Sequence, residues 1–155
     1  MSVGQRIAAA SNRFYLRVRH PEAFRAAAEP GTAHDFAALA GHKYCLLTTF
    51  RRDGTPVPTP VWFGVGEGRL YVRTEAAVGK VKRIRNDPHV RIAPCTFRGK
   101  PLGLTVEGTA RVLPAAEEER AERAIAANYG LGRRLYEGAG GGMGIELVYL
   151  EVTPA

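Results

Sequence analysis

Serine and cysteine are both scarce in this chain of 155 residues. Its only serines are Ser2 and Ser11, and no G-x-S-x-G sequence is present, which argues against a serine hydrolase. Cys45 and Cys95 each lie inside an apolar run and lack C-x-x-C spacing. We therefore expect two small, buried thiols in a reducing compartment, and no covalent catalysis by cysteine.

Metal, nucleotide and membrane signals are missing as well. The histidines show neither H-E-x-x-H nor any i, i+4 pair, so no metal site is predicted. No G-x-x-x-x-G-K-[ST] is present, and no G-x-G-x-x-G leads from a strand into a helix. No apolar run approaches the roughly 20 residues of a membrane span, and no secretory h-region opens the chain. We expect a cytoplasmic protein.

Positive charge is in excess: 22 Lys and Arg against 15 Asp and Glu give a net charge of +7. Such a balance fits an anionic partner, either a phosphate ligand, a nucleic acid or a membrane surface. It equally fits an arginine-rich proteome in which the charge has no function. A single-stranded nucleic acid is disfavoured, because few aromatics beyond Tyr71 and Phe97 are available for base stacking.

Residues 1–31 are interpreted as an N-terminal helical extension, and residues 32–155 as one cofactor-binding domain. In the extension, apolar residues such as Phe14 and Leu16 alternate with arginines, as in a basic amphipathic helix. Such a helix packs on its own domain or on a partner subunit more often than on a membrane, so peripheral membrane contact is the less favoured alternative.

Six strands are predicted, separated by turn signals such as Asp53-Gly54 and Gly66-Glu67-Gly68. Helices are predicted near Phe36–Ala40, Val78–Arg85 and Glu117–Tyr129, and no βαβ alternation is present. This pattern favours a mainly β fold, a small antiparallel barrel with peripheral helices. The strands are Tyr44–Arg51, Thr55–Val65, Leu70–Val72, His89–Phe97, Leu102–Val112 and Ile145–Val152.

Three prolines fall in the second predicted strand, at Pro56, Pro58 and Pro60. Proline donates no ladder hydrogen bond, so this strand must be an edge, a bulge or a wall of a gap. Strand alternation directs the prolines to one face and Val57, Thr59 and Val61 to the other. The unpaired edge could serve a flat heterocycle, or could simply prevent aggregation.

A basic segment, Gly79–Arg85, follows the third predicted strand and ends at Asp87-Pro88. Free N–H groups at a helix start bind phosphate oxygens, glycine permits close approach, and lysine adds a charge. The alternative is a solvated basic helix, which the spacing alone fits equally well. The candidate anion site consists of Arg73, Thr74, Gly79, Lys80, Val81 and Lys82.

Three sequences, DGTPVPTPVWF, GRLYVRT and GKVKRIRNDPHVRIAPC, together resemble the split β-barrel flavin and deazaflavin oxidoreductases, the pyridoxamine-phosphate-oxidase-like superfamily. They are most similar to the branch that uses the deazaflavin coenzyme F420, and the resemblance covers roughly Phe36 to Thr153. It implies a six-stranded antiparallel split β-barrel that forms a homodimer. The cofactor would lie in a groove between the subunits.

The resemblance also implies roles for residues. The cofactor ring would lie along Thr59, Pro60, Val61 and Trp62, and its phosphate end on the candidate anion site. The expected reaction is hydride transfer from the reduced deazaflavin to an unsaturated small organic acceptor, without a fixed catalytic side chain. The alternatives are an FMN-dependent oxidase or reductase on the same fold, and a non-catalytic cofactor-binding protein.

Overall fold

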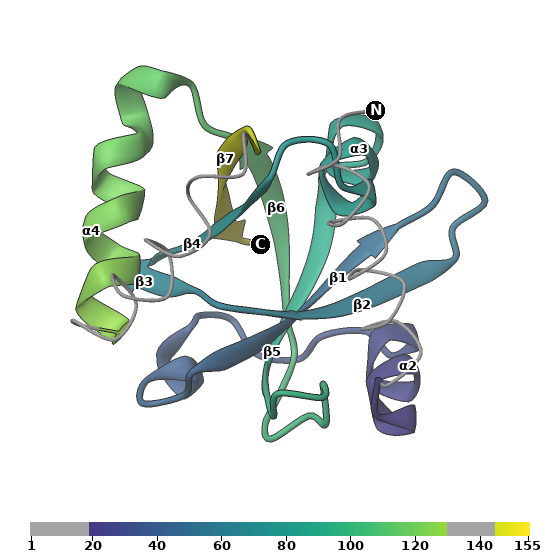
Figure 1. The fold of residues 1–155 in the computed structure, drawn as a ribbon. Coiled ribbons are helices and arrows are strands. Elements are labelled where there is room, and N and C mark those ends of the chain that lie inside the picture. The colour runs from purple at the N-terminus through teal and green to yellow at the C-terminus, as the bar shows by residue number, and fades with distance from the viewer. Residues whose placement is uncertain (1–18, 130–144) are drawn as a thin grey trace.

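The computed structural model of the protein describes residues 19–129 and 145–155, so most of the predicted extension lies outside the described residues. Within these ranges no helix is long and apolar enough to cross a membrane. The elements, labelled as in Figure 1, are α2 (Pro21–Ala28), η1 (Ala37–Leu39, a 3₁₀ helix), β1 (Tyr44–Phe50), β2 (Pro56–Val61), β3 (Gly64–Gly66), β4 (Arg69–Glu75), α3 (Gly79–Asn86), β5 (His89–Cys95), β6 (Val106–Val112), η2 (Ala115–Glu117, a 3₁₀ helix), α4 (Glu118–Tyr129) and β7 (Leu147–Pro154).

All the described strands belong to one antiparallel sheet with the order β2-β1-β5-β6-β7-β4-β3. The two edge strands, β2 and β3, follow one another in the chain. Figure 1 shows this continuous ribbon passing from β2 on the right to β3 on the left, in front of the other strands. The sheet therefore curls until its edges approach each other, which makes a half-barrel.

The prediction of six strands is wrong by one, because the segment Thr55–Val65 forms two strands instead of one. The break falls at Trp62 and Phe63. The Phe63 N–H donates to the Tyr129 hydroxyl at 2.9 Å, and its carbonyl accepts from Asn128 Nδ2 at 3.0 Å. The end of α4 thus satisfies main-chain groups that a continuous strand would have paired in a ladder.

The proline-rich strand is an edge of the sheet, which is one of the three arrangements that its prolines allowed. β2 pairs only with β1, and its prolines lie opposite Phe50, Thr48 and Leu46. Its other residues, including Thr59 and Val61, lie opposite Thr49, Leu47 and Cys45 on the core face. Proline therefore costs no ladder bond here, since the second side of β2 has no strand to pair with.

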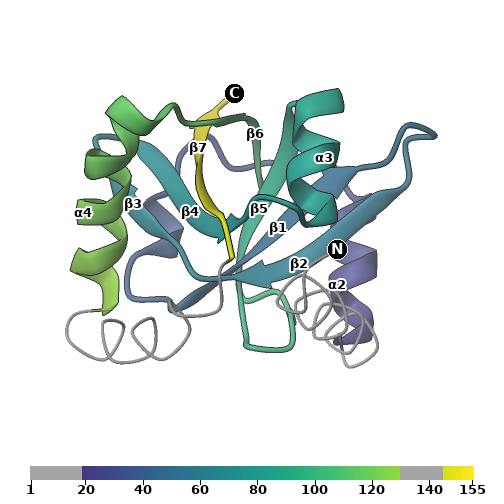
Figure 2. The same ribbon diagram turned by 45° about the horizontal axis from the view of Figure 1, so that its top comes forward.

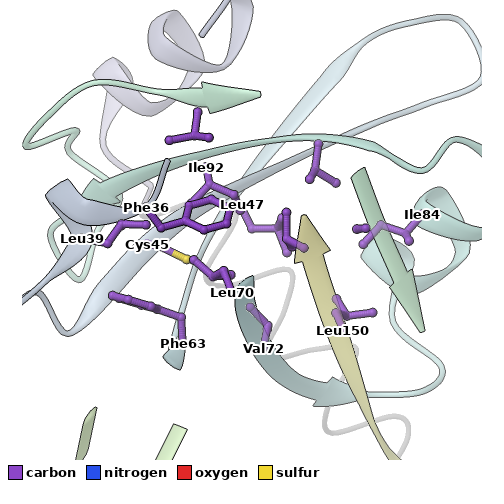
Figure 3. Close-up of a cluster of buried hydrophobic side chains, with 14 residues drawn as sticks. Phe36, Leu39, Cys45, Leu47, Phe63, Leu70, Val72, Ile84, Ile92 and Leu150 are labelled. Carbon is purple, nitrogen blue, oxygen red and sulfur yellow. The ribbon is translucent and has the colours of Figure 1, made fainter. Parts of the chain in front are cut away.

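The main core fills the inside of the curl (Figure 3). Inward-facing residues from the strands, such as Leu47 and Ile92, pack there with Phe36 and Leu39 from the η1 segment. Ile84 of α3 joins the same cluster. These helical segments therefore contribute apolar side chains to the core that the strands alone do not complete.

Two helices cover the outer surface of the sheet, on opposite sides of the molecule (Figures 1 and 2). On one side Ala121 and Ile125 of α4 pack with Tyr71 and Tyr149, as the predicted apolar face of that helix required. On the other side α2 places Ala23 beside Leu46, Ala93 and Cys95.

A buried carboxylate, Glu151 on β7, ties α4 to the sheet. It is 2% exposed and accepts from Arg111 Nε at 3.0 Å and Arg120 Nη2 at 2.8 Å. Burial by itself would raise the pKa of Glu151, but the hydrogen bonds from these arginines outweigh it and lower the pKa. The carboxylate is therefore charged and paired, and it is a structural group.

The contact between β3 and α4 leaves no room for a side chain at Gly64, where a Cβ would lie 2.3 Å from the Ala124 carbonyl carbon. We expect Gly64→Ala to lower the free energy of unfolding by at least about 2 kcal/mol, because α4 must move away from the sheet. Gly66→Ala on the same strand is the control: its Cβ would be 3.4 Å from Ala124 Cβ. Urea denaturation of both variants tests this, and equal stabilities would contradict the packing.

Candidate functional site

The candidate anion site centres on the start of α3. The cap residue Val78 is extended (φ −78°, ψ 158°), makes no side-chain capping bond, and the first turn contains no acidic residue. The first N–H groups of any α-helix lack partners within the helix, and its dipole favours negative charge there. The start of α3 therefore has the electrostatic character of an anion site.

The sequence holds α3 in place through one apolar stripe. Val78, Val81 and Ile84 are buried, as their spacing predicts, whereas Lys82 and Arg85 are exposed. The helix ends at Asn86, before Asp87-Pro88, where proline disfavours further helix. Because the Val81 side chain is buried in the protein, only its main chain is available to a ligand.

The Arg83 side chain folds back over the first turn of α3. A Cβ at position 79 would lie 2.7 Å from Arg83 Nη1, so Gly79 leaves the space that this guanidinium uses. Arg83 Nε donates to Thr49 Oγ1 on β1 at 2.6 Å. This bond fixes the guanidinium between the helix start and the core face of β1.

The surroundings of Lys80 perturb its protonation. Burial lowers its pKa to about 8, the nearby Glu75 carboxylate raises it, and the positive charges of Arg83 and Arg19 lower it further. An ammonium in this position is poorly compensated by the protein. A bound anion would favour the protonated form and so raise the pKa again.

The two predicted residues on β4 face opposite ways. Thr74 is buried and alternates with Leu70 and Val72, which point into the core. Arg73 lies on the other face, with its guanidinium carbon 5.9 Å from the centre of the Tyr149 ring. The structure therefore does not bring Arg73 and Thr74 to the same side of the sheet.

The predicted ring-binding residues on β2 are divided between two faces. Thr59 and Val61 are half-buried on the core face, where Val61 packs against the main core. Pro60 lies on the outer face, where Gly99 and Ala23 of α2 are also found. A ring on the core face of this strand would therefore contact Thr59 and Val61. A ring on the outer face would contact Pro60 instead.

Trp62 follows β2 and already has an aromatic partner. Its ring stacks on Tyr129 at a centroid distance of 4.6 Å and an interplanar angle of 16°. Lys43 Nζ lies 5.5 Å from the Tyr129 ring centre, and the Tyr129 hydroxyl donates to the Lys43 carbonyl. Burial raises the pKa of Tyr129, so this hydroxyl stays protonated. One face of the Trp62 ring is therefore covered by Tyr129.

Three residues at the α3 corner were missed from the sequence: Arg83, Thr49 and Arg19. Arg83 could have been predicted, because residues four apart in a helix lie on the same face and Arg83 follows Gly79 by four residues. Thr49 and Arg19 gave no signal, because they lie far from α3 in the chain. No cluster of metal-ligating side chains is found in the described ranges.

Together, a curled antiparallel sheet and a helix start with no acidic residue in its first turn define an antiparallel half-barrel with a basic corner at α3. A family model, pyridoxamine 5'-phosphate oxidase, matches residues 32–154, and the chain belongs to this family. It is a split-barrel family, in agreement with the fold described above. No curated protein sequence matches the chain.

Solved structures with the same fold include proteins with different ligands. An F420 reductase is 20% identical with a TM-score of 0.53, over 80% of this chain and 95% of that one. An FAD-binding protein of Mesorhizobium loti is 15% identical, with a TM-score of 0.55 over 76% and 82%. HutZ, the heme storage protein of Vibrio cholerae, is 17% identical, with a TM-score of 0.54 over 74% and 83%. At these identities the likeness shows the fold alone.

Both thiols are buried, as predicted, and we expect neither to react in the native protein. Burial raises the pKa of Cys95 to about 12 and the pKa of Cys45 well above its usual value. Only the thiolate is nucleophilic, so iodoacetamide at pH 8 should leave both unmodified until the protein is unfolded. Intact-mass measurement checks this. Alkylation of either cysteine without unfolding would contradict the burial.

Proposed function

We propose that this protein is an oxidoreductase that transfers hydride between the reduced deazaflavin coenzyme F420 and an unsaturated small organic acceptor. The observation that carries the proposal is the start of α3, where Lys80 lies in the first turn, the Arg83 guanidinium lies beside Gly79, and no acidic residue caps the helix. Membership of the pyridoxamine 5'-phosphate oxidase family supports a cofactor of the flavin type.

The residues present fit the phosphate end of such a cofactor. Gly79 offers a main chain without a Cβ, the first N–H groups of α3 can donate, and Lys80 and Arg83 supply charge. Thr49 holds the Arg83 guanidinium in place through the bond at 2.6 Å. When bound, the deazaflavin ring supplies the hydride chemistry, and the protein supplies binding and orientation.

The same corner would accept the phosphate of FMN, which makes an FMN-dependent enzyme the alternative. A deazaflavin tail carries carboxylates in addition to phosphate, so it makes fuller use of the neighbouring basic residues, such as Lys82 and Arg51. We therefore rank F420 first. We also propose that a second copy of the chain completes the cofactor groove beside β2, whose Thr59 and Val61 are only half-buried.

Cofactor titration tests the proposal, with Trp62 as the reporter, because it is the only tryptophan of the chain. We expect F420 to quench its fluorescence with a tighter Kd than FMN. We also expect Lys80→Ala to weaken F420 binding by about 1–3 kcal/mol, the loss of a charge-assisted contact. Arg85→Ala, at an exposed position on the same helix, should change the Kd little.

Two results would count against the proposal. Tight binding of FMN together with no binding of F420 would show that the cofactor is FMN and not the deazaflavin. An unchanged Kd for both cofactors in Lys80→Ala would show that the cofactor phosphate does not bind at the start of α3.

Cofactor affinity should fall as the pH rises from 7 to 9. The phosphate favours protonated Lys80, whose pKa in the free protein is about 8, so binding is strongest below that pH. Above it, affinity should fall by up to about tenfold per pH unit, because binding must then take up a proton. Lys80→Arg, which stays charged over this range, should give a nearly flat profile, and a flat wild-type profile would contradict the assignment.

A further inference from the structure

Arg19, the residue two positions before α2, is a buried cation whose guanidinium has no hydrogen-bond partner among the described residues. It is 5% exposed, and its Nε, Nη1 and Nη2 atoms have no hydrogen-bond acceptor among the described residues. A guanidinium has five N–H donors and stays charged in proteins. A buried charge is normally paired and hydrogen-bonded, because desolvation is otherwise strongly unfavourable. The arginine is therefore placed as if to meet a group that is not part of the described chain.

The charge of Arg19 interacts with the cations of the α3 corner. Burial lowers the pKa of Arg19 to about 10, and the positive charge of Arg83 lowers it further. The charge of Arg19 in turn lowers the pKa of Lys80. Cys95 also lies nearby, but its thiol is neutral at physiological pH, since burial raises its pKa to about 12.

The cations of this corner outnumber its acidic groups. Among the described residues, Glu75 is the one carboxylate that acts on Lys80, and no carboxylate acts on Arg19 or Arg83. Arg51 adds a further positive charge beside Arg83. No ion pair within the described ranges includes Arg19, Lys80 or Arg83. The corner therefore has more positive charge than a single negative charge would compensate.

We propose that Arg19 joins Lys80 and Arg83 in one site for an oxyanion group that carries at least two negative charges. The inference rests on the proposed function and specifies the charge of the bound group. Lys80, Arg83 and the helix N–H groups suffice for one phosphate charge, and Arg19 binds the second. Arg19, which lies just before α2, thereby contributes directly to cofactor binding.

Two sources supply a group of this kind. FMN ends in a phosphate monoester, which is a dianion above its second pKa of about 6. The F420 tail places carboxylates beyond its phosphate. Both therefore offer a second negative charge near the first, and the variants below are titrated with each cofactor to distinguish them. If Arg19 binds the phosphate monoester itself, the loss of Arg19 weakens the binding of FMN more than the binding of F420.

The first experiment uses methyl phosphate and dimethyl phosphate, which differ by one negative charge at pH 7. Binding is measured from the ligand-dependent shift of the unfolding midpoint. We expect the wild type to bind methyl phosphate at least about tenfold more tightly than dimethyl phosphate, because the second negative charge gains a charge-assisted contact. Arg19→Met should remove most of this preference. Arg25→Met is the matched control, since Arg25 lies on α2 with its side chain 80% exposed.

A second measurement separates a binding role from a structural one. Without ligand, Arg19→Met should raise the unfolding midpoint, because it replaces a buried unpaired charge by an apolar side chain of similar length. A structural arginine would give a lower midpoint instead. Arg19→Lys, which keeps a charge but presents fewer donors, should restore part of the preference for methyl phosphate.

The outcomes are separable. An unchanged preference for methyl phosphate in both Arg19→Met and Arg19→Lys overturns the inference, and so does a lower midpoint for Arg19→Met without ligand. If the Arg19 variants bind F420 and FMN normally while Lys80→Ala does not, Arg19 is not part of the site and the proposed function stands. If Lys80→Ala also binds both normally, the proposed function fails as well.

Discussion

The architecture depends on a covalent constraint: two residues, Trp62 and Phe63, join the strands at opposite edges of the sheet. Three peptide units span at most about 10 Å, so the ends of β2 and β3 must approach to that distance. A flat sheet of seven strands could not satisfy this, and the sheet curls around its core. Hydrogen bonds between the end of α4 and both main-chain groups of Phe63 hold the junction: the Phe63 N–H donates to Tyr129, and its carbonyl accepts from Asn128.

The same curl creates the charged corner. It brings the core face of β1, with Thr49, against α3, and there Arg83 is fixed by a side-chain hydrogen bond. The corner is costly to the free protein, since burial lowers the pKa of Arg19, Lys80 and Arg83 alike. The contrast with Glu151 is informative: that buried charge is paired with arginines, whereas Glu75 is the one carboxylate among the described residues that acts on the α3 cations.

Much of the fold could be predicted because its signals are local. Apolar runs and glycine turns located the strands, prolines limited β2 to an edge, a bulge or a gap, and the Val78, Val81, Ile84 stripe located α3. The break at Trp62 and Phe63 could not be predicted, because its partners Asn128 and Tyr129 are about 65 residues away in the chain. β-Strand propensity continues through the break, so nothing local indicates it.

For the site, the sequence by itself determined the basic helix start, with Gly79 and Lys80, because turn, stripe and charge lie within one short segment. Only the tertiary structure decided which other groups belong there. It directed Arg73 to the outer face of β4, stacked Trp62 on Tyr129, and brought Arg19 within the electrostatic influence of Arg83. The physical reason is that the electrostatic interaction of two charges depends on their distance in space, whereas a sequence pattern shows only their separation along the chain.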